Sequence, residues 1–493
     1  MFTVVVLIVA LVLLVALDTV KKRRLYPAIP TVSPCYPLVG NVLKFQGQTL
    51  EQKFRTLTTI FSTAPRLFKL WLGPVMVVGV THPELIQKLL NDPNCLEKPF
   101  FYDFLNMKHG LISARIDFWK VSRKVLNPTM NVKFLHDSIP VFEKCSRNMV
   151  NRMKACPKLE EPIDVLPFTM QCSLEMVCAT TMGAEVLERE GSQKFMEDTE
   201  EYVHFMLVAS RIFNVWLYSD VIYRKTKQYL IECRTREACL DFAMKTIKVR
   251  RAALKLKDHK QDSTTGPKIL IDQVLTMDIN KEMSDQNLCE QIWTLVAAGS
   301  DTAAHGVAHA CLILAMFPHL QEKLLTEIKS ILPSDQTPIT PEALKHLTFL
   351  DMFFKECLRV APLGPIISRK NLAPIKLDGN RFPPGTMFLV NFCGLHQRED
   401  IWGPAADQFD PERFQPERAR LRHPYSYLPF STGSRNCIGW RYAMINTKVM
   451  LIHIVRNFRL STTIKYEELR FAMGITLHLA FKHLITLEDR TSF

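Results

Sequence analysis

A cysteine at position 437 has the surroundings of a metal ligand. It lies in the segment Phe430-Ser-Thr-Gly-Ser-Arg-Asn-Cys-Ile-Gly439, directly before an amphipathic stretch that predicts a helix from Trp440 to about Phe458. The positive end of a helix and its free backbone N–H groups stabilise a thiolate, which lowers the pKa of the thiol. The sequence therefore predicts that Cys437 binds iron as a thiolate.

The neighbours of this cysteine suit a flat macrocycle. Gly433 and Gly439 allow a tight turn and a close approach of the backbone to a planar group. Arg435 is expected to reach a haem propionate through a charge-assisted hydrogen bond worth about 1.5–3 kcal/mol. Phe430 is expected to pack beside the sulfur. A lone cysteine is more often inert packing, but five such residues at fixed spacing rarely coincide by chance.

This segment matches the haem-binding loop of the cytochrome P-450 superfamily, and the whole chain resembles that family. Lys355-Glu-Cys-Leu-Arg359 resembles the family's Glu-x-x-Arg helix, and Asp410-Pro-Glu-Arg-Phe contains the arginine, Arg413, that joins it. Spacing of i, i+3 places Glu356 and Arg359 on one helical face. A lone pair of this kind is usually a weak surface salt bridge. The resemblance instead implies a buried ion network that supports the cysteine loop.

The resemblance also implies haem b (iron protoporphyrin IX) as cofactor, with further residues at its propionates. Trp119-Lys-Val-Ser-Arg123 resembles the family's Trp-x-x-x-Arg helix, whose i, i+4 spacing lets Trp119 and Arg123 address one carboxylate. Arg369 is the third arginine expected there. Three arginines around two carboxylates are electrostatically reasonable in a partly buried site.

Oxygen chemistry is expected on a long helix that contains Ala298-Gly299-Ser-Asp301-Thr302. This segment resembles the family's Ala/Gly-Gly-x-Asp/Glu-Thr signature, in which a break in the helical hydrogen bonding makes room for dioxygen. Reductive cleavage of O₂ consumes two protons. By resemblance, Thr302 holds the reacting oxygen by hydrogen bonding and Asp301 passes protons from solvent. The cysteinate favours the cleavage by donating electron density.

Two departures refine the resemblance. Ala303 replaces a second threonine that is common in the family, and this change should leave proton delivery intact. The segments around Glu356 and Asp400 place the chain nearest the insect branch of the clan that contains fatty-acid ω-hydroxylases. Many enzymes of that clan carry a glutamate that becomes ester-linked to the haem where this chain has Ala298. The link cannot form there, which weakens the expectation of strict terminal-carbon hydroxylation.

The composition agrees with one large folded body. The chain has 493 residues, 47% of them hydrophobic and 23% charged, as in ordinary globular proteins. Its 13 cysteines are never spaced Cys-x-x-Cys, so neither a zinc ribbon nor a disulfide framework is indicated. The net charge of +13 is compatible with nucleic acid, an anionic membrane or an acidic protein partner. Under the resemblance no nucleic-acid partner is expected.

The first residues predict a membrane anchor. Residues 2–17 are apolar except Thr3, and the basic cluster at 21–24 follows them. Such a run can just span a bilayer, with Asp18 near the interface and the basic cluster in the cytosol. A cleaved signal peptide is the alternative, but it expects its charge before the apolar core. We expect an anchor at 1–24, a proline-rich hinge at 25–41 and a catalytic domain at 42–493.

The predicted fold is mainly α with small β-sheets, in a single domain of the cytochrome P-450 type. Most of the chain from 50 to 354 is predicted to be helical, and 255–268 is predicted to be an exposed loop. The clearest predicted helices are 83–91, 117–126, 141–153, 233–256 and 287–316, and the clearest predicted strands are 68–80, 387–392 and 475–485.

The expected function is a microsomal monooxygenase on the cytosolic face of the endoplasmic reticulum. It would insert one atom of O₂ into a lipophilic substrate, with electrons from NADPH-cytochrome P-450 reductase and cytochrome b5 as an additional candidate donor. Arg441 and Lys448 are expected to steer an acidic reductase to the cysteine face. Alternatives are a haem-thiolate hydroperoxide isomerase or dehydratase, and a non-catalytic haem carrier. The expected pocket draws on 100–118, 202–223, 296–302, 362–367 and 473–477.

Overall fold

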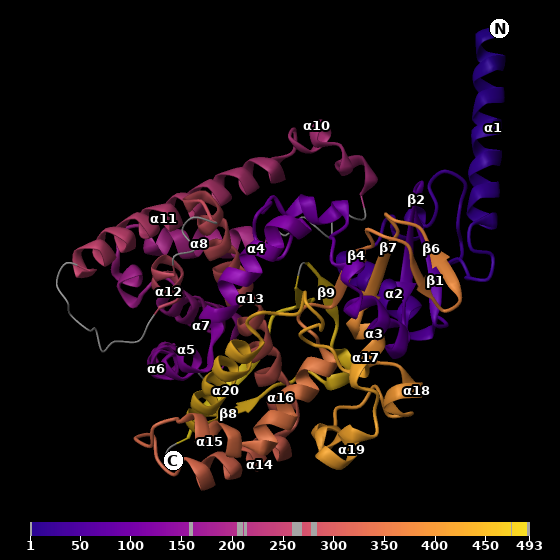
Figure 1. Cartoon of the computed structure of the whole chain (residues 1–493). Coiled ribbons are helices and arrows are strands. Elements are labelled where there is room, and N and C mark those ends of the chain that lie inside the picture. Colours follow the sequence, from indigo (N-terminus) through magenta and orange to yellow (C-terminus); the bar gives the residue numbers. More distant parts are fainter. Residues whose placement is uncertain are drawn as a thin grey trace.

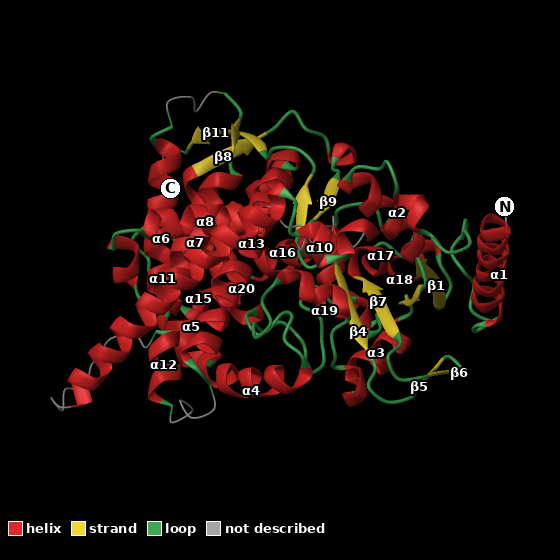
Figure 2. Ribbon diagram, turned by 90° about the horizontal axis from the view of Figure 1, so that it is seen from above, coloured by secondary structure: helices red, strands yellow, loops and turns green. Residues whose placement is uncertain are grey.

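The protein is mainly helical, with small sheets in a single domain (Figure 1). The computed structural model describes residues 2–156, 161–204, 211, 214–258, 269–277, 283–474 and 476–490. Figure 2 shows that most helices gather on one side of the molecule, while the largest sheet lies on the side nearer the N-terminus.

Helix α13 (Asp285–Met316) forms the centre of the helical part. Ser284 caps its first turn by accepting a hydrogen bond from the Asn287 N–H at 3.2 Å. Nearly all of its side chains are buried, as expected of a helix that is apolar on every face. The helices that pack directly on it include α7 (Leu166–Thr181), α20 (Trp440–Asn457), α11 (Lys227–Asp258) and α16 (Thr348–Val360).

The remaining helices surround this centre. Those with described bounds are α2 (Leu50–Thr63), α3 (Pro83–Asn91), α4 (Ile116–Leu126), α5 (Val132–Asp137), α6 (Ile139–Lys154), α8 (Ser192–His204), α10 (Asp220–Tyr223), α12 (Leu270–Thr276), α14 (Pro318–Ile331), α15 (Pro341–His346), α17 (Phe392–His396), α18 (Glu399–Trp402) and α19 (Pro416–Arg420).

The largest sheet has the strand order β1-β2-β7-β4. Its strands are β1 (Leu67–Leu72), β2 (Val75–Val80), β7 (Met387–Asn391) and β4 (Ile366–Lys370). The smaller sheets combine β3 (Ile163–Asp164), β11 (Leu484–Asp489) and β8 (Phe458–Ser461), then β9 (Phe471–Met473) with β10 (Leu477–Leu479), and β5 (Ile375–Leu377) with β6 (Asn380–Phe382). Strands distant in sequence thus pair, β2 with β7 and β3 with β11, which fixes the later segments against the earlier ones.

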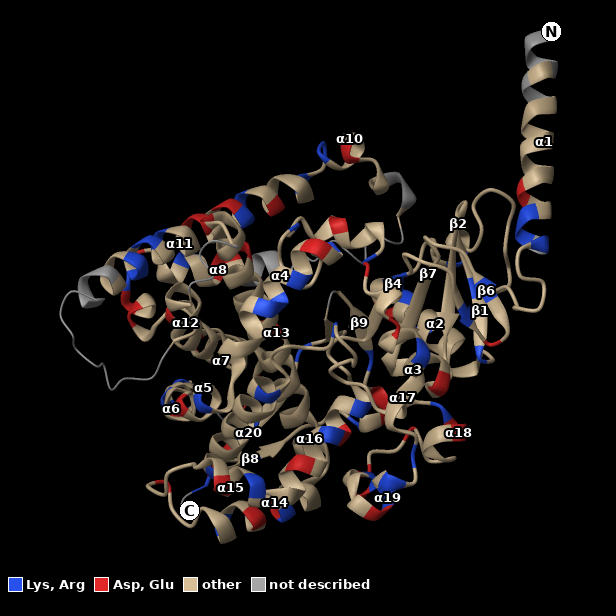
Figure 3. Ribbon diagram, in the orientation of Figure 1, with Lys and Arg blue, Asp and Glu red and all other residues tan. Residues whose placement is uncertain are grey.

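Helix α1 (Phe2–Arg24) extends away from the body beside the largest sheet (Figure 1). In Figure 3 the Lys and Arg positions of α1, coloured blue on the ribbon, lie at its end nearest the body. Among the described residues, no single helix is both long and apolar enough to cross a membrane, although the bent pair α13 and α14 reaches that length and composition together. The Asp18 carboxylate accepts a hydrogen bond from the Leu38 N–H at 2.7 Å, which ties the end of α1 to the segment that follows.

The proline-rich segment after α1 is held against β1. The Asn41 amide donates to the carbonyls of Val32 and Pro34 at 2.7 and 2.6 Å, and its oxygen accepts from the Trp71 N–H at 2.8 Å. The buried Lys69 ammonium donates to the carbonyls of residues 25 and 26. Because these buried donors and acceptors are satisfied, the segment is a fixed part of the fold.

Most predicted elements agree with the structure, with differences at their ends. The predicted helix at 83–91 is α3. The predicted strand at 68–80 is divided by a turn into β1 and β2, which pair as an antiparallel hairpin. The predicted single strand at 475–485 is wrong: β10 and the start of β11 occupy it in different sheets, and residue 475 lies outside the described residues. The predicted loop at 255–268 is wrong over 255–258, which belongs to α11, and its remainder lies outside the described residues.

Arg359 on α16 is fully buried, and all of its N–H groups have acceptors. Its Nε and Nη2 donate to the two carboxylate oxygens of Glu356, each at 2.7 Å. The other N–H groups donate to the backbone carbonyls of His396, Ala406 and Gln408 at 3.0, 2.7 and 2.9 Å. A guanidinium has five N–H donors, so one side chain fixes three points of the segment between α17 and Phe409.

Glu356 completes this network from the other side. Its Oε1 accepts the Asp410 N–H at 2.9 Å and lies 3.6 Å from Arg413 Nε. Burial raises the pKa of Glu356, and the two guanidinium groups oppose that effect. The network therefore has the buried geometry that the sequence predicted, with Arg413 as its third member.

The network reaches the cysteine loop through His396. The Nε2 atom of His396 accepts the Leu428 N–H at 3.0 Å, and Leu428 lies two residues before Phe430. Burial, followed by the charge of Arg359, lowers the pKa of His396 to about 3, so this ring stays neutral and can accept. Tyr427 adds a bond from its hydroxyl to the Lys355 carbonyl at 2.9 Å. The start of the cysteine loop is thereby attached to α16.

Replacing Arg359 by Ala should destabilise the protein by about 3–5 kcal/mol, because Glu356 becomes an unpaired buried charge. The free energy of unfolding and the haem content of the purified protein measure this effect. The control is Arg418→Ala, which removes a surface pair with Asp410 (3.1 Å, Arg418 53% exposed) and should change stability by less than about 1 kcal/mol. Normal stability and haem content in Arg359→Ala would contradict the prediction.

Candidate active site

Cys437 stands three residues before the first residue of α20. Its N–H donates to the Phe430 carbonyl at 3.0 Å, which closes the loop between these residues. Gly433 has φ +71°, and a Cβ atom there would collide with the Leu90 carbonyl at the end of α3. Only glycine allows the loop to turn while packed so closely. A Cβ at Gly439 would enter open space.

The side chain of Cys437 is exposed although it lies inside the protein. Burial raises the pKa of its thiol above the ordinary value and outweighs the Gly439 N–H and the charge of Arg123, which lower it. The lowered pKa expected from the helix end is therefore not found for this thiol. Among the described cysteines, Cys437 is the one whose side chain is exposed. Because the surrounding loop encloses it, this exposed surface faces an internal space. The sulfur is thus available to a ligand on the side of the loop away from α20.

Three cations gather near this loop without an equal number of anions. Burial, followed by the charge of Arg369, lowers the pKa of Arg435 to about 9. Burial lowers the pKa of Arg369 as well, and burial with both guanidinium groups lowers the pKa of Lys98 well below its ordinary value. Within the described part of the chain, Arg435 Nε and Nη1 and Arg369 Nε are buried without a hydrogen-bond acceptor.

This cluster fits the two propionates of haem. Unpaired buried cations are costly, and two carboxylates between them would supply both the missing charge and the missing acceptors. The open space at Gly439 and the accessible Cys437 thiol suit the flat ring and its iron. The residues present therefore fit iron protoporphyrin IX, with Cys437 as ligand and with Arg369, Arg435 and Lys98 at the carboxylates.

Trp119 and Arg123 also reach this region, but in different ways. The guanidinium of Arg435 lies 4.4 Å from the centre of the Trp119 ring, a stacking contact that orients the arginine. Arg123 donates to the Asn436 carbonyl at 2.9 Å and to the Asn436 side-chain oxygen at 2.5 Å. Arg123 thus holds the residue next to Cys437, while its buried Nε has no acceptor among the described residues.

The oxygen-activation segment lies in the middle of α13. Leu295, Ala298 and Thr302 keep partial exposure there while most neighbouring side chains are buried. Their spacing places them on one face of the helix, which therefore borders an internal space. Gly299 is also partly exposed, and a Cβ on it would lie 3.2 Å from Val177, so this glycine lets α7 approach.

The expected break in the helix is not present as an interruption: α13 is continuous through this segment. The Thr302 hydroxyl donates to the Ala298 carbonyl at 2.8 Å. A hydroxyl that bonds back one turn can release that carbonyl and turn toward a ligand by rotating about one bond.

Asp301 lies on another face of α13 and is 2% exposed. Its carboxylate oxygens contact His305 Nδ1 at 3.2 Å and the Thr476 hydroxyl at 2.5 Å. Burial raises the pKa of Asp301, but the charge and hydrogen bonds of His305 and Thr476 outweigh it, so the pKa lies below its ordinary value. Asp301 is therefore an anion that reaches solvent only through other side chains.

The stretches predicted to line a substrate pocket are partly brought together. Phe100, Phe104 and Tyr218 form an aromatic group with ring centres 5.5–5.9 Å apart, which joins the η3 helix (Phe100–Leu105) to the η6 helix (Val215–Tyr218). The Leu477 N–H donates to the Leu363 carbonyl at 3.0 Å, which joins 473–477 to 362–367. Within these stretches, residues 205–210, 212–213 and 475 lie outside the described residues.

Sequence reasoning missed Lys98, His305, Thr476 and His478. His305 follows Asp301 by four residues on one helix, so this contact had a sequence signal. The other contacts join distant segments. Thr476 and His478 belong to the β9–β10 hairpin, and no local sequence pattern predicts that this hairpin packs on α13.

Comparisons with known proteins give the same picture. The family model "Cytochrome P450" matches residues 30–478. Probable cytochrome P450 313a4 of Drosophila melanogaster is 28% identical over 435 residues, 87% of each chain. Human cytochrome P450 4V2 is 29% identical over 481 residues, 94% of this chain and 90% of that one. Cytochrome P450 4c3 of Drosophila melanogaster is 27% identical over 457 residues, 88% and 84% of the two chains.

These relatives agree with the insect branch that the sequence resembles. The match spans the cysteine loop, the ion network and the oxygen-activation segment. The chain therefore belongs to the cytochrome P450 family, whose members are haem-binding monooxygenases.

Proposed function

We propose that this protein is a microsomal monooxygenase that inserts one oxygen atom of O₂ into a lipophilic substrate, using electrons from NADPH-cytochrome P450 reductase. The observation that carries the proposal is the arrangement on α13, where Thr302 borders an internal space and Asp301 is held ionised behind it. An acid beside an alcohol is what proton delivery to oxygen requires.

The haem, when bound, supplies a redox-active iron for the reductive cleavage of O₂. The protein holds this group through the Cys437 thiolate, which the Gly439 N–H stabilises, and through the cations Arg369, Arg435 and Lys98. Thr302 holds a proton at its Oγ1, within reach of the internal space. Asp301, an anion at rest, receives a proton at its carboxylate and passes it toward Thr302.

The alternative functions, a hydroperoxide isomerase or dehydratase and a haem carrier, would not use all the features of this site. A hydroperoxide isomerase or dehydratase uses neither a reductase nor a proton relay, and a haem carrier needs only the cysteine loop and the cations. Neither explains why Asp301 is buried and ionised beside Thr302. A monooxygenase would use every one of these features.

The substrate class follows from the lining. Phe100, Phe104, Tyr218, Leu295 and Ala298 present aromatic or aliphatic surface, which suits a lipophilic molecule. Fatty acids, hormones and xenobiotics all meet this description. Ala298 leaves no carboxylate for an ester link to the haem, so we expect oxidation at more than one carbon of a long-chain substrate.

The same proposal includes attachment to the cytosolic face of the endoplasmic reticulum membrane. Residues 1–24 combine an apolar run with a following basic cluster, and 25–41 is packed on β1. Asp18 and Lys22 pair at 2.7 Å at the body end of α1, where their charges meet the hinge. An anchor held in this way would keep the body at a fixed height above the bilayer.

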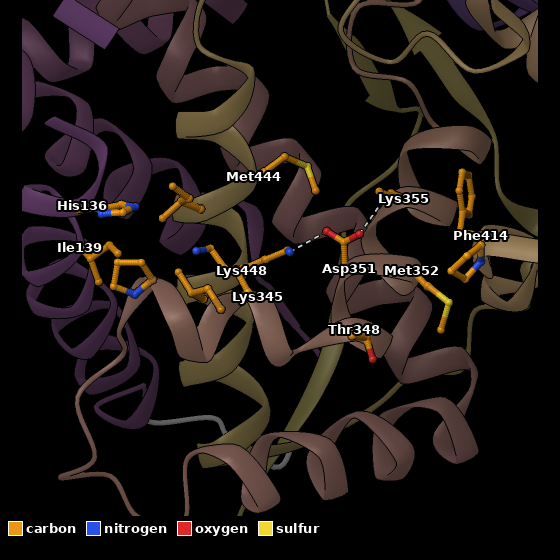
Figure 4. Close-up of a pocket in the computed structure, with 14 residues that line it drawn as sticks. His136, Ile139, Lys345, Thr348, Asp351, Met352, Lys355, Phe414, Met444 and Lys448 are labelled. Carbon is orange, nitrogen blue, oxygen red and sulfur yellow. Dashed lines mark hydrogen bonds and ion pairs between the residues drawn. The ribbon is translucent and has the colours of Figure 1, made fainter. Parts of the chain in front are cut away.

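The reductase is proposed to dock on the face that carries Trp440 and Arg441. Arg441 is exposed and stacks on the Trp440 ring at 4.5 Å. Lys448, the other expected docking residue, is only 11% exposed and binds Asp351 at 2.6 Å. Figure 4 shows Lys448 and Lys355 both reaching Asp351 inside a pocket of about 500 Å³. Because Lys448 is largely buried and shares the Asp351 carboxylate with Lys355, we assign the docking role to the exposed Arg441.

The function is tested with purified full-length protein, reductase and NADPH across a panel of fatty acids, steroids and xenobiotics. We expect O₂ consumption and, with ¹⁸O₂, one labelled oxygen atom in the product of at least one substrate. Turnover of hydroperoxides without NADPH would favour the isomerase. Stable haem binding with no turnover in the panel would favour the carrier.

Replacing Cys437 by Ala should remove the thiolate ligand. The reduced protein under carbon monoxide should then lose the strongly red-shifted Soret band, measured by difference spectroscopy. Cys156→Ala, a change at a partly buried cysteine after α6, is the control and should keep that band. A Cys437→Ala protein that retains the band would rule out this ligand.

Replacing Arg441 by Glu should slow reductase-supported turnover by up to about tenfold at low salt, because electrostatic steering is lost. The effect should shrink at high salt. Turnover supported by cumene hydroperoxide bypasses the reductase and should stay unchanged. Lys376→Glu on β5 reverses an exposed charge elsewhere and is the matched control. An equal loss of both activities would show that Arg441 supports the haem loop instead.

A further inference from the structure

Asp301, His305, His478 and Thr476 form a closed ring of hydrogen bonds between α13 and β10. His305 Nδ1 contacts Asp301 Oδ1 at 3.2 Å and the Asp301 carbonyl at 3.0 Å. His305 Nε2 lies 2.9 Å from His478 Nδ1, and His478 Nε2 lies 2.9 Å from Thr476 Oγ1. The Thr476 hydroxyl closes the ring on Asp301 Oδ2 at 2.5 Å.

The donors and acceptors of this ring fix where its protons lie. A backbone carbonyl can only accept, so His305 Nδ1 carries a proton. When the Thr476 hydroxyl donates to Asp301, its oxygen must accept from His478 Nε2. His478 Nδ1 then accepts from His305 Nε2, so His305 carries protons on both nitrogens and Asp301 is an anion.

The same contacts permit a second arrangement with the same number of protons. The proton on His305 Nε2 moves to His478 Nδ1, the proton on His478 Nε2 moves to Thr476, and the Thr476 hydroxyl proton moves to Asp301 Oδ2. The three hydrogen bonds along which these protons move survive with their directions reversed, while His305 Nδ1 still donates to Asp301. Asp301 is then a neutral acid and His305 a neutral imidazole, so the net charge of the ring does not change.

We propose that this ring is a proton relay that recharges Asp301, with His305, His478 and Thr476 as positioning residues that act through Asp301. The proposal rests on the proposed function, because it supplies protons to the oxygen-activation segment. After Asp301 releases its proton toward Thr302, the ring lacks one proton and is negative. His478 is its partly exposed member, whereas Asp301, His305 and Thr476 are buried, so solvent returns the proton at His478.

The surroundings favour the charge-separated arrangement at rest. Burial lowers the pKa of His305, but Asp301 outweighs burial and the pKa is raised. The other titratable groups that face the ring are His309, His483 and Asp164. Burial and the neighbouring histidines lower the pKa values of His309 and His483, the latter to about 3, so both stay neutral. The positive charge therefore resides on His305, next to the acid it must recharge.

A divalent cation is the competing occupant. One atom each of Asp301, His305 and His478 lies within 4.8 Å of the others, a spacing that zinc could use. These atoms, however, are already joined to one another or to Thr476 by hydrogen bonds, so protons satisfy the ring without a metal. The metal content of the purified protein distinguishes the two: stoichiometric zinc that is lost in His478→Gln would overturn the relay.

The direct test observes the histidines. In ¹⁵N-histidine-labelled holoenzyme, in the diamagnetic carbon monoxide form, His305 should show two protonated nitrogens near neutral pH. His478 should carry its proton on Nε2. Substitution of each histidine by Gln assigns the signals. Thr476→Val, which removes the hydroxyl and little else, should leave the His478 Nε2–H without its acceptor, so the signal of this proton should move upfield. A neutral His305 in the wild type, or an unchanged His478 in Thr476→Val, would overturn the proposal.

The kinetic test measures how consumed O₂ divides between hydrogen peroxide and water, with reductase and NADPH and without added substrate. Thr476→Val should release roughly tenfold more peroxide per water formed, because general acid delivery is lost. Its solvent isotope effect in D₂O should differ from that of the wild type. Thr476→Ser keeps the hydroxyl and should restore both values. His309→Gln, one helical turn beyond His305 and outside the ring, is the matched control.

The outcomes separate this proposal from the proposed function. If the wild type consumes no O₂ with reductase and NADPH, the function fails, while the histidine spectra still decide the relay. If the wild type turns over and Thr476→Val matches it in peroxide release and isotope effect, the relay fails and the function stands. If Thr476→Val does not fold, Thr476→Ser must retain the wild-type spectra, and altered tautomers there would overturn the relay.

Discussion

The buried pair between Glu356 and Arg359 is the contact on which the position of the cysteine loop depends. Two charges removed from water are tolerated only when each has its full set of partners. Arg359 meets this condition by taking carbonyls from the segment after α17, and Glu356 by taking the Asp410 N–H. His396, at the start of that segment, accepts the Leu428 N–H. The cysteine loop that follows Leu428 therefore cannot move without breaking hydrogen bonds of this network.

A second group of buried charges behaves in the opposite way. Arg369 lowers the pKa of Arg435, both guanidinium groups lower the pKa of Lys98, and among the described residues the two arginines retain N–H groups without an acceptor. This difference distinguishes buried charges that stabilise the fold from buried charges that bind a ligand. Saturated charges hold the backbone, whereas unsaturated charges of one sign mark where an anionic ligand belongs.

Much of this arrangement could be predicted from the sequence, because its signals are local. The Cys437 loop, the Glu356–Arg359 spacing and the start of α3 at Pro83 each occupy one short segment. The strand predicted at 475–485 failed because its alternation continues across the turn between β10 and β11, whose partners β9, β3 and β8 come from elsewhere in the chain. The cation cluster that contains Lys98 and Arg435 likewise forms only when segments distant in sequence pack together. The same holds for the contact between His305 and His478.

The cation cluster of Arg369, Arg435 and Lys98 has a consequence for the stability of the protein before it binds haem. A chain without haem holds the buried guanidinium groups of Arg369 and Arg435 without carboxylate partners, so binding of the cofactor stabilises its native state. A ligand present at a thousand times its dissociation constant adds about 4.1 kcal/mol to folding stability. The amount of folded protein should thus follow the haem supply of the cell, and chains made during haem shortage should be removed by proteolysis before they reach any substrate.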